Sequence, residues 1–255
     1  NLPVSFLWAY NNLYPVAKIE GKTYEAVEKI SSASISQLPA NANTASITAV
    51  LNTVRNGLAN DNALVTTYLY RPLVGVTEIV EPNKEKATFT YDDFNRLFQV
   101  KEHNGKVVNE YQYNYKRKNC MKRKYMFMAL LCYALTTAAQ DASHNYVRTR
   151  SMLDETGGKY LDKVEYFDGL GRPFQTVLKK VTASSSNLVT LQEYDVAGRA
   201  ANSWLPIVSS AEYVAPASFK SSAPGNYGND SRPYGQPVYE ASPLNRTVKE
   251  YGPGA

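Results

Sequence analysis

A six-residue motif, aromatic-Asp-x-x-Gly-Arg, occurs three times and constrains the fold of this chain more than any other feature. Its aspartate accepts hydrogen bonds from backbone N–H groups at the start of a tight turn, and its glycine adopts the positive φ that closes the turn. The arginine begins the returning strand, where its stem covers an aromatic ring and its head meets the aspartate. Repetition of this pattern predicts β-hairpins. The turn residues are Asp92, Asn95 and Arg96; Asp168, Gly171 and Arg172; and Asp195, Gly198 and Arg199.

The first copy of the motif has asparagine where the other two have glycine. Asparagine tolerates the left-handed region, so Asn95, Gly171 and Gly198 are all expected to have positive φ. A β-branched residue is penalised there, and Gly198→Val should cost about 1–2 kcal/mol of stability. Metal ligation and acid–base catalysis are the alternative roles for the three aspartates. Their fixed place before Gly-Arg favours the turn role.

Alternation of apolar and polar side chains around the motifs predicts two antiparallel meanders. The first has strands at 87–91, 96–102 and 106–115, with turns at 92–95 and 103–105. The second has strands at 161–168, 172–181, 188–195 and 199–204.

Helical periodicity is confined to the first half of the chain. Ile47, Leu51, Val54 and Leu58 recur at helical spacing and predict an amphipathic helix over 46–58. A rougher apolar stripe predicts another helix near 23–38. The sequence therefore predicts a mainly β protein with a small helical part in the first half, built as antiparallel hairpin and meander sheets in two separate modules.

A secretory signal peptide is predicted in the middle of the chain. Met121 is followed by Lys-Arg-Lys, by an uninterrupted apolar or aromatic run at 125–135, and by small residues up to Ala139. This order is typical of a signal peptide cleaved after Ala139, and the run is shorter than the roughly 20 residues that span a bilayer. Such a segment should be apolar all round, with few contacts to either half. The alternative is a buried helix beside a basic loop.

A signal peptide cannot act from position 121 of a longer chain, so we interpret the sequence as two adjacent gene products read as one. The expected parts are a first module at 1–115, a read-through junction at 116–120, the signal peptide at 121–139 and a second module at 140–255. The first residue is Asn rather than Met, which fits a fragment or a processed product.

The net charge of +5 does not indicate a nucleic-acid partner. Residues 1–115 hold 10 basic and 11 acidic residues, and residues 126–255 hold 12 of each. The excess comes from six basic residues between 116 and 124. Nucleic-acid-binding domains instead spread their basic residues over a face or groove.

No pattern for catalysis or cofactor binding is found. His103 and His144 lie in different halves, and the sequence has no His-Glu-x-x-His, Gly-x-Ser-x-Gly or phosphate-loop motif. The glycines at 169 and 171 lack the third glycine of a dinucleotide site. Cys120 and Cys132 fall in the predicted junction and signal peptide. We therefore expect no enzyme activity, no catalytic residue, no cofactor and no metal.

The tail from Leu205 onward holds seven of the thirteen prolines, too many for regular secondary structure. Disorder is the alternative, but disordered segments are poor in aromatic residues and this tail has six. We predict an ordered, irregular strap laid over the sheet. The aromatic residues are Tyr213, Phe219, Tyr227, Tyr234, Tyr239 and Tyr251.

Both halves resemble the RHS (rearrangement hotspot, or YD-repeat) cell-surface proteins of bacteria. Residues 145–255 resemble the uncharacterised amino-terminal domain of those proteins, and the first half resembles a YD repeat near a carboxyl end together with the segment that precedes it. The matching stretches are 8–15, 68–77, 90–97 and 111–113 in the first half, and 160–162, 166–173, 237–240 and 242–246 in the second.

The resemblance implies β-hairpins of YD-repeat type that build a spiral shell or scaffold, often around a carboxyl-terminal toxin. The chain would be a non-catalytic structural part of a secreted or cell-envelope bacterial protein. Its partners would be the rest of the shell, a toxin domain or surface glycans, and the membrane would matter only for export. Two alternatives stay open. A carbohydrate-binding module would need an exposed planar row of tyrosines, and a secreted hydrolase would need a carboxylate pair in a cleft.

Overall fold

The structure, a computed structural model, describes residues 2–35, 44–115 and 143–254. The chain divides into two compact units. Unit 1 comprises Asn1–Glu110 with Glu155–Gly157, and unit 2 comprises Tyr111–Asp154 with Gly158–Ala255. The predicted junction and signal peptide at 116–139 lie outside the described residues. None of the helices in the described part of the chain is long and apolar enough to cross a membrane.

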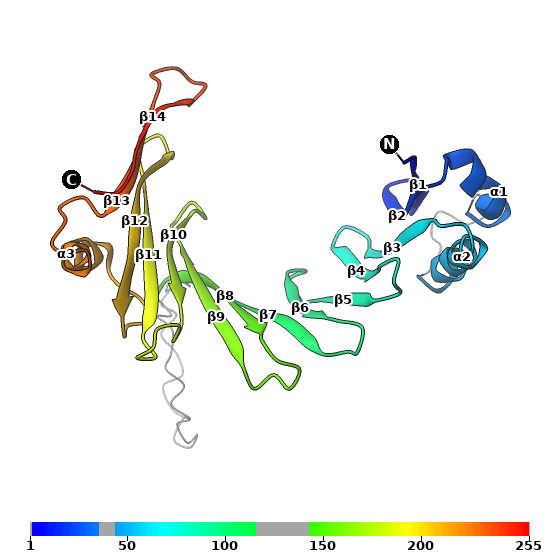
Figure 1. The fold of residues 1–255 in the computed structure, drawn as a ribbon, viewed down its shortest axis with the longest axis horizontal. Coiled ribbons are helices and arrows are strands. Elements are labelled where there is room, and N and C mark those ends of the chain that lie inside the picture. Colours follow the sequence, from blue (N-terminus) through cyan, green and yellow to red (C-terminus); the bar gives the residue numbers. More distant parts are fainter. Residues whose placement is uncertain (1, 36–43, 116–142, 255) are drawn as a thin grey trace, which may run out of the picture. The chain divides into compact units, whose positions relative to one another are not determined.

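Unit 1 is an antiparallel meander in which each strand pairs with its neighbour in the sequence (Figure 1). Two helices stand between the second and third strands. The strands are β1 (Val4–Ala9), β2 (Tyr14–Glu20), β3 (Leu64–Arg71), β4 (Gly75–Val80), β5 (Lys86–Tyr91), β6 (Leu97–Lys101) and the start of β7 (Val107–Asn114), and the helices are α1 (Tyr24–Ile35) and α2 (Thr44–Gly57).

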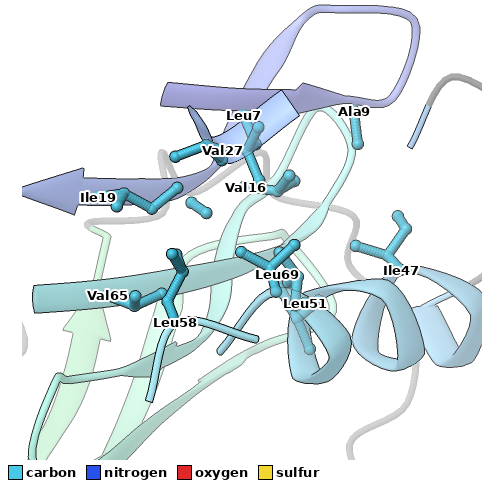
Figure 2. Close-up of a cluster of buried hydrophobic side chains, with 12 residues drawn as sticks. Leu7, Ala9, Val16, Ile19, Val27, Ile47, Leu51, Leu58, Val65 and Leu69 are labelled. Atoms are coloured by element: carbon cyan, nitrogen blue, oxygen red, sulfur yellow. The ribbon is translucent and has the colours of Figure 1, made fainter. Parts of the chain in front are cut away.

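The core of unit 1 lies between the helices and one face of β1, β2 and β3 (Figure 2). The α2 stripe predicted from the sequence supplies Ile47, Leu51 and Val54, all buried. In β1 buried and exposed residues alternate, so Leu7 and Ala9 enter the core. The remaining members are Val16, Ala17, Ile19, Val27, Leu58, Val65 and Leu69.

Unit 2 continues the same meander pattern through seven further strands and adds one helix. Its core is formed by one face of β8 to β12 together with the helix. The elements are β8 (Asn145–Met152), β9 (Tyr160–Phe167), β10 (Pro173–Leu178), β11 (Asn187–Tyr194), β12 (Ala200–Ser209), α3 (Pro216–Asn226), β13 (Tyr234–Tyr239) and β14 (Thr247–Tyr251).

The predicted fold class, mainly β in antiparallel meanders, is confirmed. The three strands expected in the first half are β5, β6 and β7, and the four expected in the second are β9 to β12. The segment 172–181, where a helix would have contradicted the hairpins, is strand β10. The two helices expected in the first half are α1 and α2.

The prediction that helices belong only to the first half is wrong, because α3 lies in unit 2. Pro216 stands in its first turn, where the missing N–H breaks no helical hydrogen bond, and Pro224 lies only two residues from its end. Phe219 and Ala223, four residues apart, are fully buried against the sheet. With only two buried side chains, α3 has little helical periodicity of apolar residues in its sequence. From the sequence alone, its prolines therefore indicate irregular structure.

The proline-rich tail is folded, as predicted, but it is more regular than an irregular strap, since it contains α3, β13 and β14. The part that does cross the sheet without regular structure is 210–215. Three side chains of the sheet hold it. The buried Gln175 amide donates to the Val214 carbonyl at 2.6 Å and accepts from the Val214 N–H at 3.0 Å. The Tyr166 hydroxyl donates to Glu212 O, and the Asn187 amide donates to Ala211 O.

Candidate functional site

The first turn motif is organised by one carboxylate. Oδ1 of Asp92 accepts hydrogen bonds from the backbone N–H groups of Phe94 and Arg96, at 2.9 and 3.0 Å. Its Oδ2 accepts from the Arg96 guanidinium, through Nε at 2.8 Å and Nη2 at 2.6 Å. Two backbone bonds close the hairpin, from Asp92 N to Arg96 O and from Asn95 N to Asp92 O. We call this Asp–Arg arrangement a clamp.

The other two motifs form the same clamp. Oδ2 of Asp168 accepts from Nε of Arg172 at 2.8 Å, and Oδ2 of Asp195 accepts from Nε of Arg199 at 2.7 Å. In both, Oδ1 again accepts two backbone N–H groups. The φ angles at Asn95, Gly171 and Gly198 are 60°, 80° and 84°, so the predicted positive φ is confirmed at all three positions.

These hydrogen bonds hold the pKa of each turn aspartate below its ordinary value. For Asp92 the main cause is the hydrogen bond from the Arg96 side chain. For Asp195 it is the backbone N–H of Arg199, followed by the guanidinium. Partial burial raises the pKa of Asp168, but the N–H and guanidinium of Arg172 outweigh it. A carboxylate that is kept ionised and faces an arginine is unsuited to act as a general acid.

A fourth clamp, which the motif search missed, closes the β13–β14 hairpin. Oε1 and Oε2 of Glu240 accept from Nε and Nη2 of Arg246 at 3.0 and 2.9 Å. Asn245 has a φ of 55°, like Asn95 in the first clamp. The turn is two residues longer, and glutamate replaces aspartate. Tyr239-Glu240 before Asn245-Arg246 was the available signal, because it repeats aromatic-acid and Asn-Arg at a wider spacing.

The clamp is not needed to make this turn. The hairpins at 81–85, 102–106 and 182–186 have the same two backbone hydrogen bonds and no Asp–Arg pair. Their fourth residues, Lys84, Gly105 and Ser185, also have positive φ. What the clamp adds is therefore a fixed direction for the arginine side chain.

In unit 2 two of the clamped arginines, Arg172 and Arg199, reach the next clamped hairpin. The Arg172 guanidinium lies over the Tyr194 ring, 4.4 Å from its centroid, and Arg199 lies over Tyr239 at 4.6 Å. The same tyrosines donate their hydroxyls to the carbonyl that follows the arginine, Tyr194 to Pro173 at 2.8 Å and Tyr239 to Ala200 at 2.9 Å. We call each such pair of contacts a rung. Alternate turns of a meander lie at the same end of its strands. The rungs therefore join successive hairpins at that end of the sheet.

Unit 1 contains a related contact without an arginine. The Tyr91 hydroxyl donates to Val76 O at 2.8 Å, one residue after Gly75. A Cβ at Gly75 would overlap the Tyr91 hydroxyl, so the absence of a side chain lets the tyrosine approach the preceding turn. Here the hydrogen bond of the rung is kept and the stacked cation is replaced by glycine.

The two histidines considered in the sequence lie apart in the described residues, and Cys120 and Cys132 fall outside them. His103 is exposed in the 102–106 turn, and His144 stacks on Tyr213 with ring centroids 4.1 Å apart. Within the described ranges, no three His, Cys, Asp or Glu side chains are placed to hold a metal. A cavity of about 280 Å³ lies beside the second motif, and among the described residues of its wall the carboxylate is that of the clamped Asp168.

The aromatic residues of the tail are packed rather than displayed as a row. Phe219 is fully buried, and the Tyr234 ring packs at a tilt against Trp204, with ring centroids 4.6 Å apart. Tyr213 lies against Tyr166 and His144. Tyr227 bonds to Pro206 O and Tyr239 lies under Arg199. Tyr251, at 39%, is the most exposed of the six, and the side chains of Arg232 and Lys249 lie over its ring. This packing favours the scaffold over the sugar-binding surface.

Comparisons with known proteins match the second half of the chain most directly. A family model described as "Domain of unknown function (DUF6443)" matches residues 136–255. No curated protein matches the chain.

Three solved structures of TcdB2-TccC3 are similar to the chain at low identity. The form without the hypervariable C-terminal region is 12% identical with a TM-score of 0.47, over 73% of this chain and 13% of that one. TcdB2-TccC3-TEV is 12% identical with a TM-score of 0.49, over 97% and 14%. TcdB2-TccC3 is 16% identical with a TM-score of 0.43, over 74% and 10%. The chain thus spans 10–14% of the length of these proteins.

The two motif glycines of unit 2 should respond differently to alanine. Gly171→Ala is expected to cost about 1 kcal/mol, because its φ is positive and the space around it is open. Gly198→Ala should cost more, since its Cβ would stand 3.1 Å from Nη1 of Arg172 and the guanidinium over Tyr194 would have to shift by a few tenths of an ångström. Urea unfolding measures both. In an Arg172→Ala background Gly198→Ala should cost no more stability than Gly171→Ala. If its additional cost stayed the same, that cost would not come from the contact with Arg172.

The first clamp should make stability depend on acid pH. The pKa of Asp92 is lower in the folded chain than the roughly 3.9 of a free aspartate, so its contribution is present above about pH 4 and is lost as the pH falls through the folded value. Asp92→Asn keeps the Oδ1 acceptor but not the ion pair. Thermal unfolding should show this variant less stable than the parent at pH 7, with a difference that shrinks as the pH falls below about 4. Asp93→Asn, which changes the exposed next residue and leaves the clamp residues in place, is the control variant.

Proposed function

We propose that the chain is a non-catalytic structural part of an RHS/YD-repeat type protein, in which hairpins are joined into a scaffold. The observation that carries this proposal is the rung. The motif's aromatic, acidic and basic side chains are used within unit 2 to fasten one hairpin to the next. A chemistry-bearing site would instead leave such groups directed at a shared cavity.

The partners follow from the same proposal. The scaffold would associate with the remaining shell of its own full-length protein and, through it, with a carboxyl-terminal toxin domain. A carbohydrate-binding module remains the second candidate because Tyr251 is exposed beside Lys249 and Arg232. A secreted hydrolase has less support, since the turn carboxylates are separately clamped.

We also propose that the chain joins two gene products, with the boundary at 116–120 and a signal peptide at 121–139. The second module, 140–255, would then be secreted or placed in the cell envelope of a bacterium. The family model supports this boundary, because its match begins at residue 136, close to the proposed cleavage site after Ala139.

A double-mutant cycle tests the scaffold role. Arg172→Met and Tyr194→Leu should each destabilise the chain, with a coupling energy of about 0.5–1 kcal/mol, the range for an exposed cation–π pair. The control cycle pairs Arg172→Met with Tyr227→Leu, because the Tyr227 hydroxyl bonds to Pro206 O elsewhere in unit 2. Denaturant unfolding supplies all the energies. A coupling energy equal to that of the control cycle would mean that the contact between Arg172 and Tyr194 does not stabilise the fold.

The boundary is tested by expressing the second half in bacteria from its own start at Met121. Export should yield a product whose first residue is Gln140, because small residues precede that bond. Mass spectrometry of the exported fraction reads the amino terminus. Ala139→Pro, next to the bond, should block cleavage, whereas Ala142→Pro beyond it serves as the comparison. An intact product that starts at Met121 and stays inside the cell would contradict the proposal.

A further inference from the structure

Unit 1 contains a compact cluster of three tyrosines. Tyr14 in β2 and Tyr70 in β3 are stacked, with ring centroids 4.9 Å apart and ring planes inclined by 26°. Tyr10, which directly follows β1, meets both rings edge-on, with centroids 5.7 and 6.1 Å away. Extended three residues beyond the Ala17–Thr67 pair, the register of β2 and β3 places Tyr14 opposite Tyr70. The stacked pair is therefore a cross-strand pair.

Backbone hydrogen bonds hold the cluster in place. The Tyr10 hydroxyl donates to the carbonyl of Tyr70 at 3.1 Å and accepts from its N–H at 3.2 Å. The Tyr14 hydroxyl accepts from the N–H of Leu73 at 3.1 Å. Tyr10 thus fixes the backbone that carries the Tyr70 ring, and Leu73 fixes the far end of the Tyr14 ring.

The turn that begins with Tyr10 is strained. Tyr10, Asn11 and Asn12 have φ angles of 53°, 63° and 59°, in the left-handed region that non-glycine residues seldom occupy in succession. Such conformations persist where the surrounding structure over-determines them, and they are concentrated at functional sites. Here the Tyr10 hydroxyl, bonded to the Tyr70 backbone, is one contact that holds the turn. The ring positions in the cluster are therefore fixed by the fold.

We propose that Tyr14 and Tyr70 are a site of oxidative cross-linking, at which a one-electron oxidant, such as a haem peroxidase with hydrogen peroxide, joins the two rings as dityrosine. Each phenol loses one electron and its hydroxyl proton to give a phenoxyl radical. The two radicals couple through a carbon–carbon bond between ring carbons ortho to oxygen, and each ring then exchanges its ortho hydrogen for a hydrogen on its oxygen. One hydrogen peroxide accepts the two electrons and two protons and becomes two waters.

Geometry and access distinguish this pair from another close pair of tyrosines. Radicals on rings that already lie together couple within one chain, without diffusion of one chain to another. Tyr166 and Tyr213 in unit 2 are almost as close, at 5.1 Å, but their ring planes are inclined by 64°. Tyr166 is also completely buried, and its hydroxyl proton is held by the Glu212 carbonyl. Tyr14 and Tyr70 are only half-buried, which leaves them within reach of an oxidant.

The cross-link closes a loop around the helical part of unit 1. Both helices, α1 and α2, lie between β2 and β3 in the sequence and share one core with these strands. A covalent link across so long a loop restricts the unfolded chain more than the folded one, as a disulfide does. The site therefore supplies unit 1 with a covalent bond between two strands of its core. This inference does not depend on the scaffold role, which rests on the rungs of unit 2.

The test treats the full chain with a haem peroxidase and hydrogen peroxide at neutral pH and locates the products by peptide mass spectrometry. We expect a link within one chain between Tyr14 and Tyr70, with a mass two hydrogen atoms below that of the separate peptides and with dityrosine fluorescence. Tyr70→Phe keeps the ring but has no phenolic hydrogen, so it should form none of this product. Tyr68→Phe, on the same strand, is the matched control and should leave the yield unchanged.

Unfolding tests whether the fold brings the two rings together. In concentrated urea the yield of the Tyr14–Tyr70 product should fall about tenfold or more, because the rings no longer lie side by side. The cross-linked chain should have a Tm about 5 °C or more above that of the untreated chain, whereas oxidised Tyr70→Phe should show no such rise. Absence of the Tyr14–Tyr70 product from the folded chain would overturn the proposal, as would products only between chains or an equal yield in urea.

Discussion

The ion pair between a turn carboxylate and the arginine four residues later is the contact on which the organisation of the hairpins depends. In the Asp168–Arg172 clamp one carboxylate oxygen accepts from two backbone N–H groups, while the other accepts from Nε and Nη2 of the guanidinium. The side chain is thereby fixed with one planar face free to stack on Tyr194. Without the clamp a long, flexible arginine would lose about 2 kcal/mol of rotamer entropy to occupy the same position.

These contacts add little to the free energy of unfolding, but they constrain how the strands pair. A partly exposed ion pair contributes about 0–1 kcal/mol, and the clamped aspartates are not deeply buried. Stability comes instead from the two cores, in which residues such as Ile19, Val164 and Phe219 are completely buried. The clamps and rungs act on register. A slip of one residue in a strand would turn every side chain to the other face, and a rung can form in only one register.

Local chemistry made the hairpins predictable, and long-range packing made the rest unpredictable. The acceptor, the positive-φ residue and the arginine of each turn lie within five consecutive residues, so Asp92–Arg96 and its two repeats were visible in the sequence. The strands followed from alternation beside them. Phe219 and Ala223 of α3 pack against a sheet formed by residues distant in the sequence. Because α3 also contains two prolines, the sequence did not predict a helix there. The rungs join residues more than twenty positions apart, such as Arg172 and Tyr194, and no local spacing shows such a contact.

The order of residues in the motif follows from two kinds of contact, one within the turn and one with another hairpin. Aspartate serves its own hairpin, whereas the tyrosine directly before it, Tyr91 or Tyr194, contacts the hairpin that came earlier in the chain. Because neighbours in a strand point to opposite faces, placing them side by side lets Tyr194 reach Arg172 and Pro173 while Asp195 leaves the strand to open the turn. The strand register that places the aspartate in the turn therefore also places the tyrosine against the previous hairpin. Tyr239-Glu240 keeps this adjacency although its turn is longer, which indicates that the contact between successive hairpins depends on the adjacency more than on the length of the turn.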